Sequence, residues 1–165
     1  MIKKKICMLG TTAVGKTSLV RRYVQGFFSE QYLTTIGVKI DKKTVDLDGQ
    51  ALTLVLWDLN GEDPFQRVAA SYLRGAAGFL LVADGTRRLT LEGALRLHER
   101  LHDALEGVPG VLVLNKADLT AAWAIEPARI EALQRQGWTV RRTSAKTGMG
   151  VEEAFEHLAR RLLAP

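Results

Sequence analysis

Residues 10–18 read GTTAVGKTS and lie between the apolar run ICMLG and the helix-like stretch LVRRYV. The change from a continuous apolar run to helical spacing predicts a tight loop that joins a buried strand to a helix. Gly10, Gly15, Lys16 and Thr17 fill the fixed places of the pattern G-x-x-x-x-G-K-[ST], which is typical of a phosphate-binding loop. A chance Gly-Lys turn is the alternative, but the flanking strand and helix favour the loop and hence a nucleoside triphosphate as ligand.

The chemistry of this loop follows from its place at a helix N-terminus, where backbone N–H groups point inward and the helix dipole adds partial positive charge. Glycines at its fixed places let the backbone approach the phosphates without a Cβ in between. We expect Lys16 to bridge the β- and γ-phosphates and Thr17 to offer its hydroxyl to Mg²⁺. Ser18 is either a further ligand or an ordinary helical residue. The other loop positions expected at the nucleotide are Ala13 and Val14.

Length and composition limit the architecture. The chain has 165 residues, of which 47% are hydrophobic and 25% charged, so we expect one globular domain over residues 1–165, neither disordered nor a coiled coil. No apolar run reaches the ~18–20 residues that cross a bilayer, and too few apolar residues follow the basic start for a signal peptide. The single cysteine, Cys7, lies in an apolar strand pattern and is expected to be a small buried hydrophobic residue. These features predict a cytoplasmic protein.

The formal charge of +5 comes from basic residues in short, scattered groups. None of these groups extends into a tract or alternates with aromatic residues, as a protein that binds single-stranded nucleic acid would need. Ordinary solvated faces are therefore favoured over a nucleic-acid or membrane patch, and no nucleic-acid partner is expected. An RNA or DNA partner is the alternative, and it requires binding that weakens steeply with salt.

Apolar runs alternate with amphipathic stretches, which predicts strands and helices in turn and hence an α/β fold with a mostly parallel sheet. Asp48-Gly49 lies between two alternating runs in TVDLDGQALTLVLW and predicts a tight hairpin, with an antiparallel strand at the sheet edge. Thr90 is expected to cap one helix and Pro127 to begin another. The expected strands are 2–9, 38–47, 51–58, 78–84, 110–115 and 138–142, and the expected helices are 16–25, 67–74, 91–106, 127–136 and 151–163.

A second motif, LNKAD, follows the apolar run GVLVL and supplies Asn115, Lys116 and Asp118. A carboxylate at the carboxyl end of a strand can accept hydrogen bonds from both the ring N–H and the exocyclic amine of guanine, whereas adenine offers neither donor in that arrangement. Such a site leaves its carboxylate unpaired with the wrong base, which can give ~10⁴–10⁵ in discrimination. The Lys116 stem is expected to lie along the plane of the base.

A third stretch, TSAKTG, follows the last expected strand and adds Ser144, Ala145 and Lys146, where the Ala145 N–H is expected to meet the guanine carbonyl. With these segments the sequence resembles the Ras superfamily of small GTPases, and its Rab-like branch most of all. The resemblance covers essentially the whole chain and rests on GTTAVGKT, TTIG, WDLNG, SYLRGAAG, NKAD and SAK, in the family's order and spacing. It implies a P-loop G domain with a six-stranded sheet, one strand antiparallel, flanked by five helices. It also implies a molecular switch that binds GTP and hydrolyses it to GDP and phosphate with Mg²⁺.

The resemblance implies further residues at the nucleotide. Thr35 in TTIG resembles the switch threonine that reaches Mg²⁺ when the γ-phosphate is present, with Thr34 as the alternative register. Asp58 in WDLNG resembles the acidic residue that holds Mg²⁺ through water. Gly61 is similar to the glycine whose N–H contacts the γ-phosphate.

The resemblance also implies an aromatic residue at the base and a surface for partners. Phe28 occupies the place where the family has an aromatic side chain against the guanine edge, with Phe27 as the alternative and a core role equally compatible for both. Tyr32 is expected either to cover the phosphates or to be an exposed tyrosine. Activating and exchange proteins and an effector are expected to bind the switch regions at about 29–38 and 58–74.

Glu62 is the main departure from the family, because the residue after that glycine is usually a glutamine that orients the attacking water. A carboxylate there is expected to lie near the γ-phosphate, where like charges repel. We therefore expect intrinsic hydrolysis to be slow and to depend on a partner, with Gln66 as an alternative water-orienting residue. A guanine-nucleotide-binding scaffold with negligible hydrolysis is the alternative function. The expected catalytic set is Lys16, Thr35, Gly61 and Glu62.

Other departures limit what the resemblance implies about partners. Thr12 stands where the family often has glycine, and its side chain is expected to crowd an arginine finger from an activating protein. Of three aromatic residues that help Rab proteins to bind effectors, Trp57 is kept, while Ile40 and Leu73 replace the other two. No cysteine lies near the carboxyl terminus, so no prenyl lipid anchor is expected, and the chain is more similar to minimal prokaryotic Ras-like GTPases.

Overall fold

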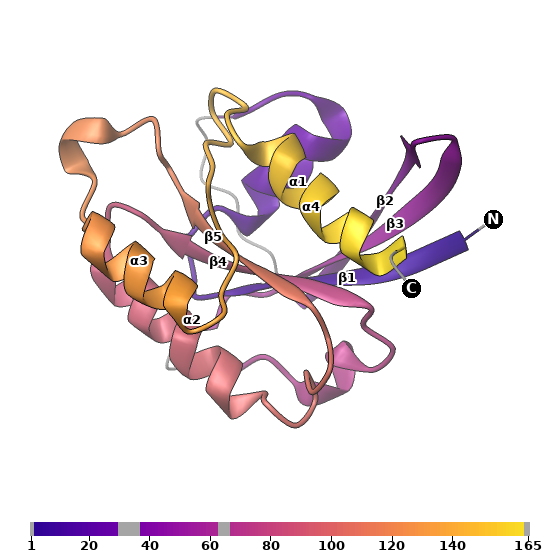
Figure 1. Ribbon diagram of the computed structural model, residues 1–165, viewed down its shortest axis with the longest axis horizontal. Coiled ribbons are helices and arrows are strands. Elements are labelled where there is room, and N and C mark those ends of the chain that lie inside the picture. Colours follow the sequence, from indigo (N-terminus) through magenta and orange to yellow (C-terminus); the bar gives the residue numbers. More distant parts are fainter. Residues whose placement is uncertain (1, 30–36, 63–66, 164–165) are drawn as a thin grey trace.

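The computed structural model describes residues 2–29, 37–62 and 67–163, in which strands and helices alternate (Figure 1). The strands are β1 (Ile2–Gly10), β2 (Val38–Leu47), β3 (Gln50–Leu59), β4 (Gly78–Asp84), β5 (Gly110–Asn115) and β6 (Val140–Arg142). The α-helices are α1 (Lys16–Gln25), α2 (Arg88–Arg100), α3 (Pro127–Arg135) and α4 (Val151–Leu163). Two short 3-10 helices are η1 (Ala70–Leu73) and η2 (Thr120–Ala122). No helix in these described ranges is long and apolar enough to cross a bilayer.

The strands form one six-stranded sheet in the order β2-β3-β1-β4-β5-β6. All neighbouring strands are parallel except β2 and β3, which form the antiparallel hairpin predicted from the Asp-Gly pair. Asp48 and Gly49 have φ angles of 54° and 90°, the positive values that a tight two-residue hairpin turn requires. The predicted fold class, an α/β sheet with one antiparallel edge strand, is confirmed.

Helices cover both faces of this sheet (Figure 1). On one face, α1 and α4 pack together, and Tyr23 stacks on Phe155 with ring centroids 4.0 Å apart. On the other face, α2 and α3 cover a second apolar cluster, in which Cys7 is fully buried. Burial raises the pKa of the Cys7 thiol to about 11, so this residue has the inert hydrophobic role that was expected.

The expected helix over 67–74 is wrong for the most part, because only one 3-10 turn, η1, forms there. Ala69 before this turn is extended and supplies no side-chain cap, and Gly75 after it adopts a φ of 76°. A stretch bounded in this way has room for a single turn, so the described residues contain four α-helices rather than five.

The helix expected over 91–106 is α2 in the structure, which begins earlier, at Arg88, and ends earlier, at Arg100. Thr90 is therefore not its N-cap. The Thr90 hydroxyl accepts a hydrogen bond from the Asp84 N–H at 2.8 Å and donates to the Arg87 carbonyl at 2.7 Å. Thr90 therefore lies inside the first turn of α2, and its hydroxyl stabilises the turn that precedes the helix. Pro127 does begin α3, as predicted, and β6 is shorter than the expected strand over 138–142.

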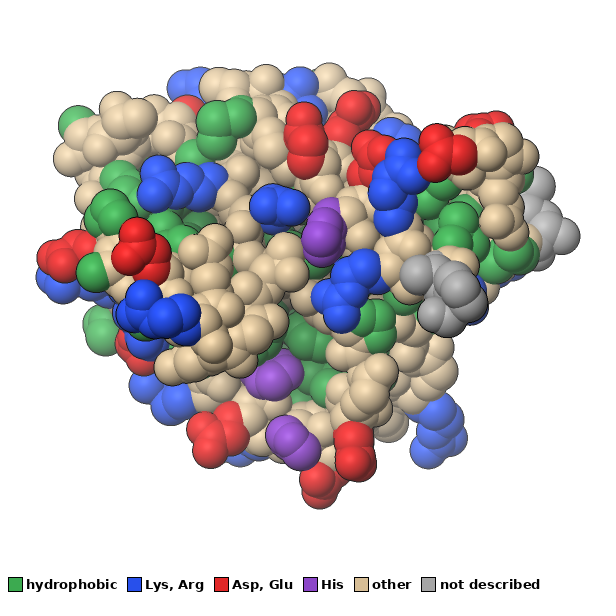
Figure 2. Space-filling view, viewed as in Figure 1, with side chains coloured by type: hydrophobic (Ala, Val, Ile, Leu, Met, Phe, Trp, Pro, Cys, Tyr) green, Lys and Arg blue, Asp and Glu red, His purple; other side chains and the backbone are tan. Residues whose placement is uncertain are grey.

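Charged side chains of both signs are dispersed over the face of the molecule shown in Figure 2. Lys and Arg side chains lie there among Asp, Glu and neutral atoms and do not merge into a continuous basic surface. The distribution on this face agrees with the scattered basic groups of the sequence.

Candidate nucleotide site

The candidate site lies at the carboxyl edge of the sheet, beside β1. This strand pairs with β3 on one side and with β4 on the other, and the chain passes from β1 to β2 and β3 before it returns to β4. In open α/β sheets, ligands bind at such a reversal of strand order, outside the carboxyl ends of the strands. At or next to these ends lie Gly10, Asp58, Asp84 and Asn115.

Two glycines of the phosphate loop (residues 10–17) are required by close packing. A Cβ on Gly10 would lie 2.5 Å from the Val82 carbonyl oxygen, and a Cβ on Gly15 would lie 2.3 Å from Nδ2 of Asn115. Gly15 also adopts a φ of 100°, which residues with a Cβ rarely reach. These glycines therefore serve two purposes: they admit the phosphates expected from the sequence, and their protein neighbours leave no space for a side chain.

Lys16 is buried at the start of α1 and points its ammonium group back over the phosphate loop. Its Nζ donates to the Thr11 carbonyl at 3.3 Å and, more weakly, to the Gly10 carbonyl at 3.5 Å. Burial lowers the pKa of Lys16 to about 8, although the charge of Asp58 opposes this effect. At neutral pH the group is therefore still mostly a cation, held where an anionic phosphate would compensate its lost hydration.

Thr17 and Asp58 meet beside this lysine and join α1 to β3. The Thr17 hydroxyl donates to Oδ2 of Asp58 at 2.7 Å, and the Asp58 side chain is almost fully buried. A hydroxyl and a carboxylate are the hard oxygen ligands that Mg²⁺ prefers. The oxygen atoms that this pair offers as ligands therefore fit Mg²⁺.

Asn115 ties the phosphate loop to the end of β5. Its Nδ2 donates to the Val14 carbonyl at 3.1 Å, and its Oδ1 accepts from the Thr143 hydroxyl at 3.1 Å. This asparagine therefore connects the loop with both segments that were expected to surround the base.

Asp118 and Ser144, which come from the two segments expected at the base, are in direct contact. The Ser144 hydroxyl donates to Oδ1 of Asp118 at 2.8 Å and accepts from the Thr147 N–H at 3.1 Å. Arg22 of α1, which no motif marks, donates from Nε to the Ala145 carbonyl at 2.8 Å and also bonds the Lys146 carbonyl. These contacts orient one oxygen of the Asp118 carboxylate and fix the backbone after β6.

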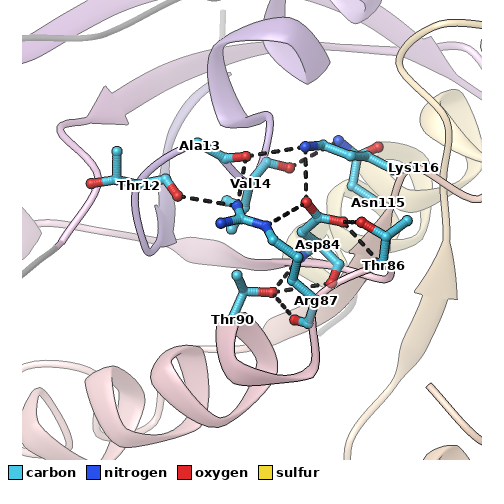
Figure 3. A network of polar contacts seen from close by, with 9 residues as sticks. All are labelled: Thr12, Ala13, Val14, Asp84, Thr86, Arg87, Thr90, Asn115 and Lys116. Atoms are coloured by element: carbon cyan, nitrogen blue, oxygen red, sulfur yellow. Dashed lines mark hydrogen bonds and ion pairs between the residues drawn. The ribbon is translucent and has the colours of Figure 1, made fainter. Parts of the chain in front are cut away.

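Lys116 is held by contacts with β4 and with the phosphate loop. Its Nζ lies 2.8 Å from Oδ2 of Asp84 and donates to the Ala13 carbonyl at 3.2 Å (Figure 3). Asp84 is the buried last residue of β4 and was missed by the sequence analysis. The signal that could have found it is an acidic residue at the end of the continuously apolar stretch GFLLVA.

The backbone of Glu62 is hydrogen-bonded to the phosphate loop, whereas its carboxylate is bound by residues outside the loop. Its N–H donates to the Gly10 carbonyl at 3.0 Å, and its own carbonyl accepts from the Thr12 N–H at 3.2 Å. The carboxylate oxygen Oε1 accepts from the Val68 N–H at 3.1 Å and pairs with the guanidinium of Arg100 in α2. Two donors, the Val68 N–H and Arg100, therefore hold this carboxylate on the side of α2, against the expected approach to the γ-phosphate.

Gly61, which precedes Glu62, leaves no room for a side chain, because a Cβ there would lie 2.6 Å from Cα of Thr12.

The remaining expected residues lie at the edge of the site or outside the described ranges. Phe28 is half-buried and packs against the core, whereas Phe27 is exposed beneath the Arg21 guanidinium, 5.3 Å from the ring centroid. Ser18 lies half-buried in the first turn of α1. Outside the described residues lie Tyr32, Thr34, Thr35 and Gln66.

The sheet reversal, the phosphate loop and the carboxylate beside the last strands define a P-loop nucleotide-binding protein with the features expected of a guanine site. A model of the Ras family matches residues 5–164. The Ras-related protein Rab-13 of Bos taurus is 35% identical over 161 residues, which cover 96% of this chain and 79% of that protein. The Ras-related protein RAB1BV of Beta vulgaris is 35% identical over 94% of this chain and 74% of its own length. The Ras-related protein Rab-1A of Dictyostelium discoideum is 36% identical over 94% of this chain and 78% of its own length.

This chain belongs to the Ras family and is a Rab-like small GTPase. The family binds GTP and GDP with Mg²⁺, and the predicted resemblance and the predicted class of enzyme are confirmed at this level.

Proposed function

We propose that this protein is a Mg²⁺-dependent switch whose own GTP hydrolysis is slow and is accelerated by a partner. The observation that supports this most directly is the position of Glu62. It occupies the place of the residue that orients the attacking water, and its carboxylate is bound by Arg100 and by the Val68 N–H. An ionised carboxylate only accepts hydrogen bonds, so it cannot donate one to a phosphate oxygen as a glutamine amide can.

The phosphate half of the site consists of residues that stabilise negative charge. Lys16 and the N–H groups of the phosphate loop hold the polyphosphate, and the Gly61 N–H meets the γ-phosphate. Thr17, Thr35 and Asp58 hold Mg²⁺, which when bound neutralises charge on the phosphate oxygens. Thr17 and Asp58 support this assignment, because the half-buried Thr17 hydroxyl already bonds the buried Asp58 carboxylate.

The base half of the site selects guanine. Asp118 accepts hydrogen bonds from the two guanine donors, and the Ala145 N–H meets the carbonyl of the base. The hydrogen bond from Ser144 to Asp118 supports this role, because it fixes one carboxylate oxygen and leaves the other for the base. Phe28 and the stems of Lys116 and Lys146 border the ring.

The switch regions, about 29–38 and 58–74, order around the γ-phosphate and loosen after its loss, and they bind the effector and the regulators. Two differences from Rab proteins, Ile40 and Leu73, argue for effectors other than theirs. Ile40 is exposed on β2, where an aromatic side chain would present a different surface.

Single-turnover cleavage of GTP tests the proposal. Purified protein loaded with GTP is expected to release phosphate slowly with Mg²⁺. Glu62→Gln is expected to release it about 10-fold faster, which is less than the ~10²–10⁴-fold that a positioned general acid or base contributes. A wild type that is faster than Glu62→Gln would defeat the proposal.

A scaffold that holds guanine nucleotide with negligible turnover is the second candidate, because the bound carboxylate of Glu62 suits it as well. The same assay separates the two functions. The switch requires complete conversion of GTP over a long incubation or with an added activator, whereas the scaffold requires GTP to persist in both.

A further inference from the structure

We infer that Arg87, which no motif of the sequence marks, is a positioning residue of the nucleotide site that slows the release of nucleotide. Together with Lys116 it holds the outer side of the phosphate loop, and Asp84 orients both cations. The inference rests on the proposed function, because it concerns the same site.

Arg87 lies just before α2 and reaches across to the phosphate loop (Figure 3). Its Nη2 donates to the Ala13 carbonyl at 3.1 Å and lies 3.5 Å from the Thr12 carbonyl, at the outer limit of a hydrogen bond. Its Nε donates to Oδ2 of Asp84 at 2.9 Å. A single guanidinium thus joins the buried end of β4 to two backbone carbonyls of the loop.

The loop needs such support at Ala13. This residue has a φ of 66°, in the left-handed region that is unfavourable for a residue with a Cβ. Two cations, Lys116 at 3.2 Å and Arg87 at 3.1 Å, donate to its carbonyl oxygen. Charge-assisted hydrogen bonds of this kind stabilise the strained conformation.

The contacts also determine where the loop amides point. In a trans peptide the C=O of one residue and the N–H of the next point in opposite directions. Arg87 and Lys116 hold the carbonyls of Thr12 and Ala13, and Asn115 holds the carbonyl of Val14 at 3.1 Å. The N–H groups of residues 13, 14 and 15 are therefore aimed at the opposite side, where the phosphates are proposed to bind.

Asp84 makes this arrangement rigid. Burial by itself would raise the pKa of Asp84, but hydrogen bonds from Lys116, Thr86 and Arg87 hold it below the ordinary value. Oδ2 accepts from both cations, while Oδ1 accepts from the N–H and the hydroxyl of Thr86 at 2.9 and 2.6 Å. The carboxylate is therefore ionised at neutral pH, and its direction is fixed by four donors.

The dissociation rate of fluorescent GDP tests the inference, with the protein kept in Mg²⁺ and chased by unlabelled GDP. Arg87→Ala is expected to release GDP and GTP roughly 5-fold faster, the size of effect that suits a charged hydrogen bond on a half-exposed side chain. Arg88→Ala is the matched control, because it removes the same charge from an exposed neighbour at the start of α2, and wild-type rates are expected. Arg87→Lys keeps the charge but not the fork that serves both Asp84 and the loop, so it is expected to lie between wild type and Arg87→Ala.

The preference for GTP over ATP serves as a second readout, because a general loss of structure would reduce it. Arg87→Ala is expected to keep that preference, because the residues that select the base are untouched. Dissociation from Arg87→Ala or Arg87→Lys at the rate of Arg88→Ala would overturn the inference, and so would a loss of base preference in step with the faster release. If the wild type itself does not distinguish GTP from ATP, the proposed function fails instead, so the two failures are distinguishable.

Discussion

Glu62 and Arg100 form an ion pair that fastens the loop after β3 to the last residue of α2. Arg100 also lies 3.3 Å from the Val68 carbonyl, while the Val68 N–H donates to the Glu62 carboxylate. The two side chains are partly buried, at 34% and 19% exposure for Arg100 and Glu62. This pair keeps a carboxylate that neighbours the phosphate loop directed toward α2.

Arg100→Ala is expected to weaken GTP binding relative to GDP binding by about 3-fold, since partly exposed ion pairs contribute less than about 1 kcal/mol. The reason is that the freed Glu62 carboxylate can approach the γ-phosphate, which only GTP has. The ratio of GTP to GDP dissociation constants measures this effect. Because the effect depends on the carboxylate, it should disappear in Arg100→Ala combined with Glu62→Gln. An undiminished effect in the double variant would show that Arg100 acts in another way.

Asp118→Ala is expected to reduce the preference for GTP over ATP by about 10²-fold or more, because the two guanine donors lose their acceptor. Ser144→Ala is the milder companion, since it removes the hydroxyl that orients Asp118 but leaves the carboxylate in place. A smaller loss, of about 10-fold, is expected for it. Competition of ATP and GTP against labelled GDP gives both values. An unchanged preference in Asp118→Ala would remove the basis for guanine selection at this residue.

The contacts that sequence reasoning recovered and those that it missed differ in a physical way. The phosphate loop, the Asp-Gly hairpin and the segments around Asn115 and Asp118 are local patterns, in which adjacent residues determine the backbone that they need. Arg87, Arg22 and Arg100 each contact partners that lie 32 to 124 residues away along the chain. No spacing rule connects such partners, because the sheet topology brings them together.

The errors in helix position have a similar cause. Thr90 has the residue type and the place of an N-cap, but its hydroxyl bonds the turn formed by Asp84 and Arg87. The stretch around η1 contains residues that tolerate a helix, yet tertiary packing buries Leu73 from a single turn. Propensity is a weak guide where one short segment must fit between a loop and a strand.

The pKa of Lys16 predicts proton uptake when nucleotide binds. Burial lowers this pKa to about 8, so at pH 9 most of the nucleotide-free protein has a neutral Lys16, whereas at pH 7 most of it is charged. Phosphate favours the charged amine and raises its pKa, so binding above pH 8 takes up a proton and the affinity falls as pH rises. Calorimetry of GDP binding at pH 9 in two buffers with different ionisation enthalpies measures the uptake, which is expected to approach one proton. Equal uptake at pH 7 and pH 9 would contradict a lowered pKa.

Gly15→Ala and Gly26→Ala separate backbone strain from steric conflict. Both glycines have left-handed φ angles, of 100° and 80°, so each alanine variant is expected to lose about 1 kcal/mol or more of folding free energy. Only at Gly15 would the new Cβ meet another group, Nδ2 of Asn115 at 2.3 Å, while nothing lies within 4 Å at Gly26. Gly15→Ala is therefore expected to displace Asn115 from the Val14 carbonyl and to weaken GDP binding by at least about 10-fold, the loss that one or more hydrogen bonds would give. Gly26→Ala is expected to bind GDP as the wild type does, and thermal unfolding with and without excess GDP, together with titration of labelled GDP, provides the comparison. Similar GDP affinities for the two variants would mean that the contact between Gly15 and Asn115 does not constrain the phosphate loop.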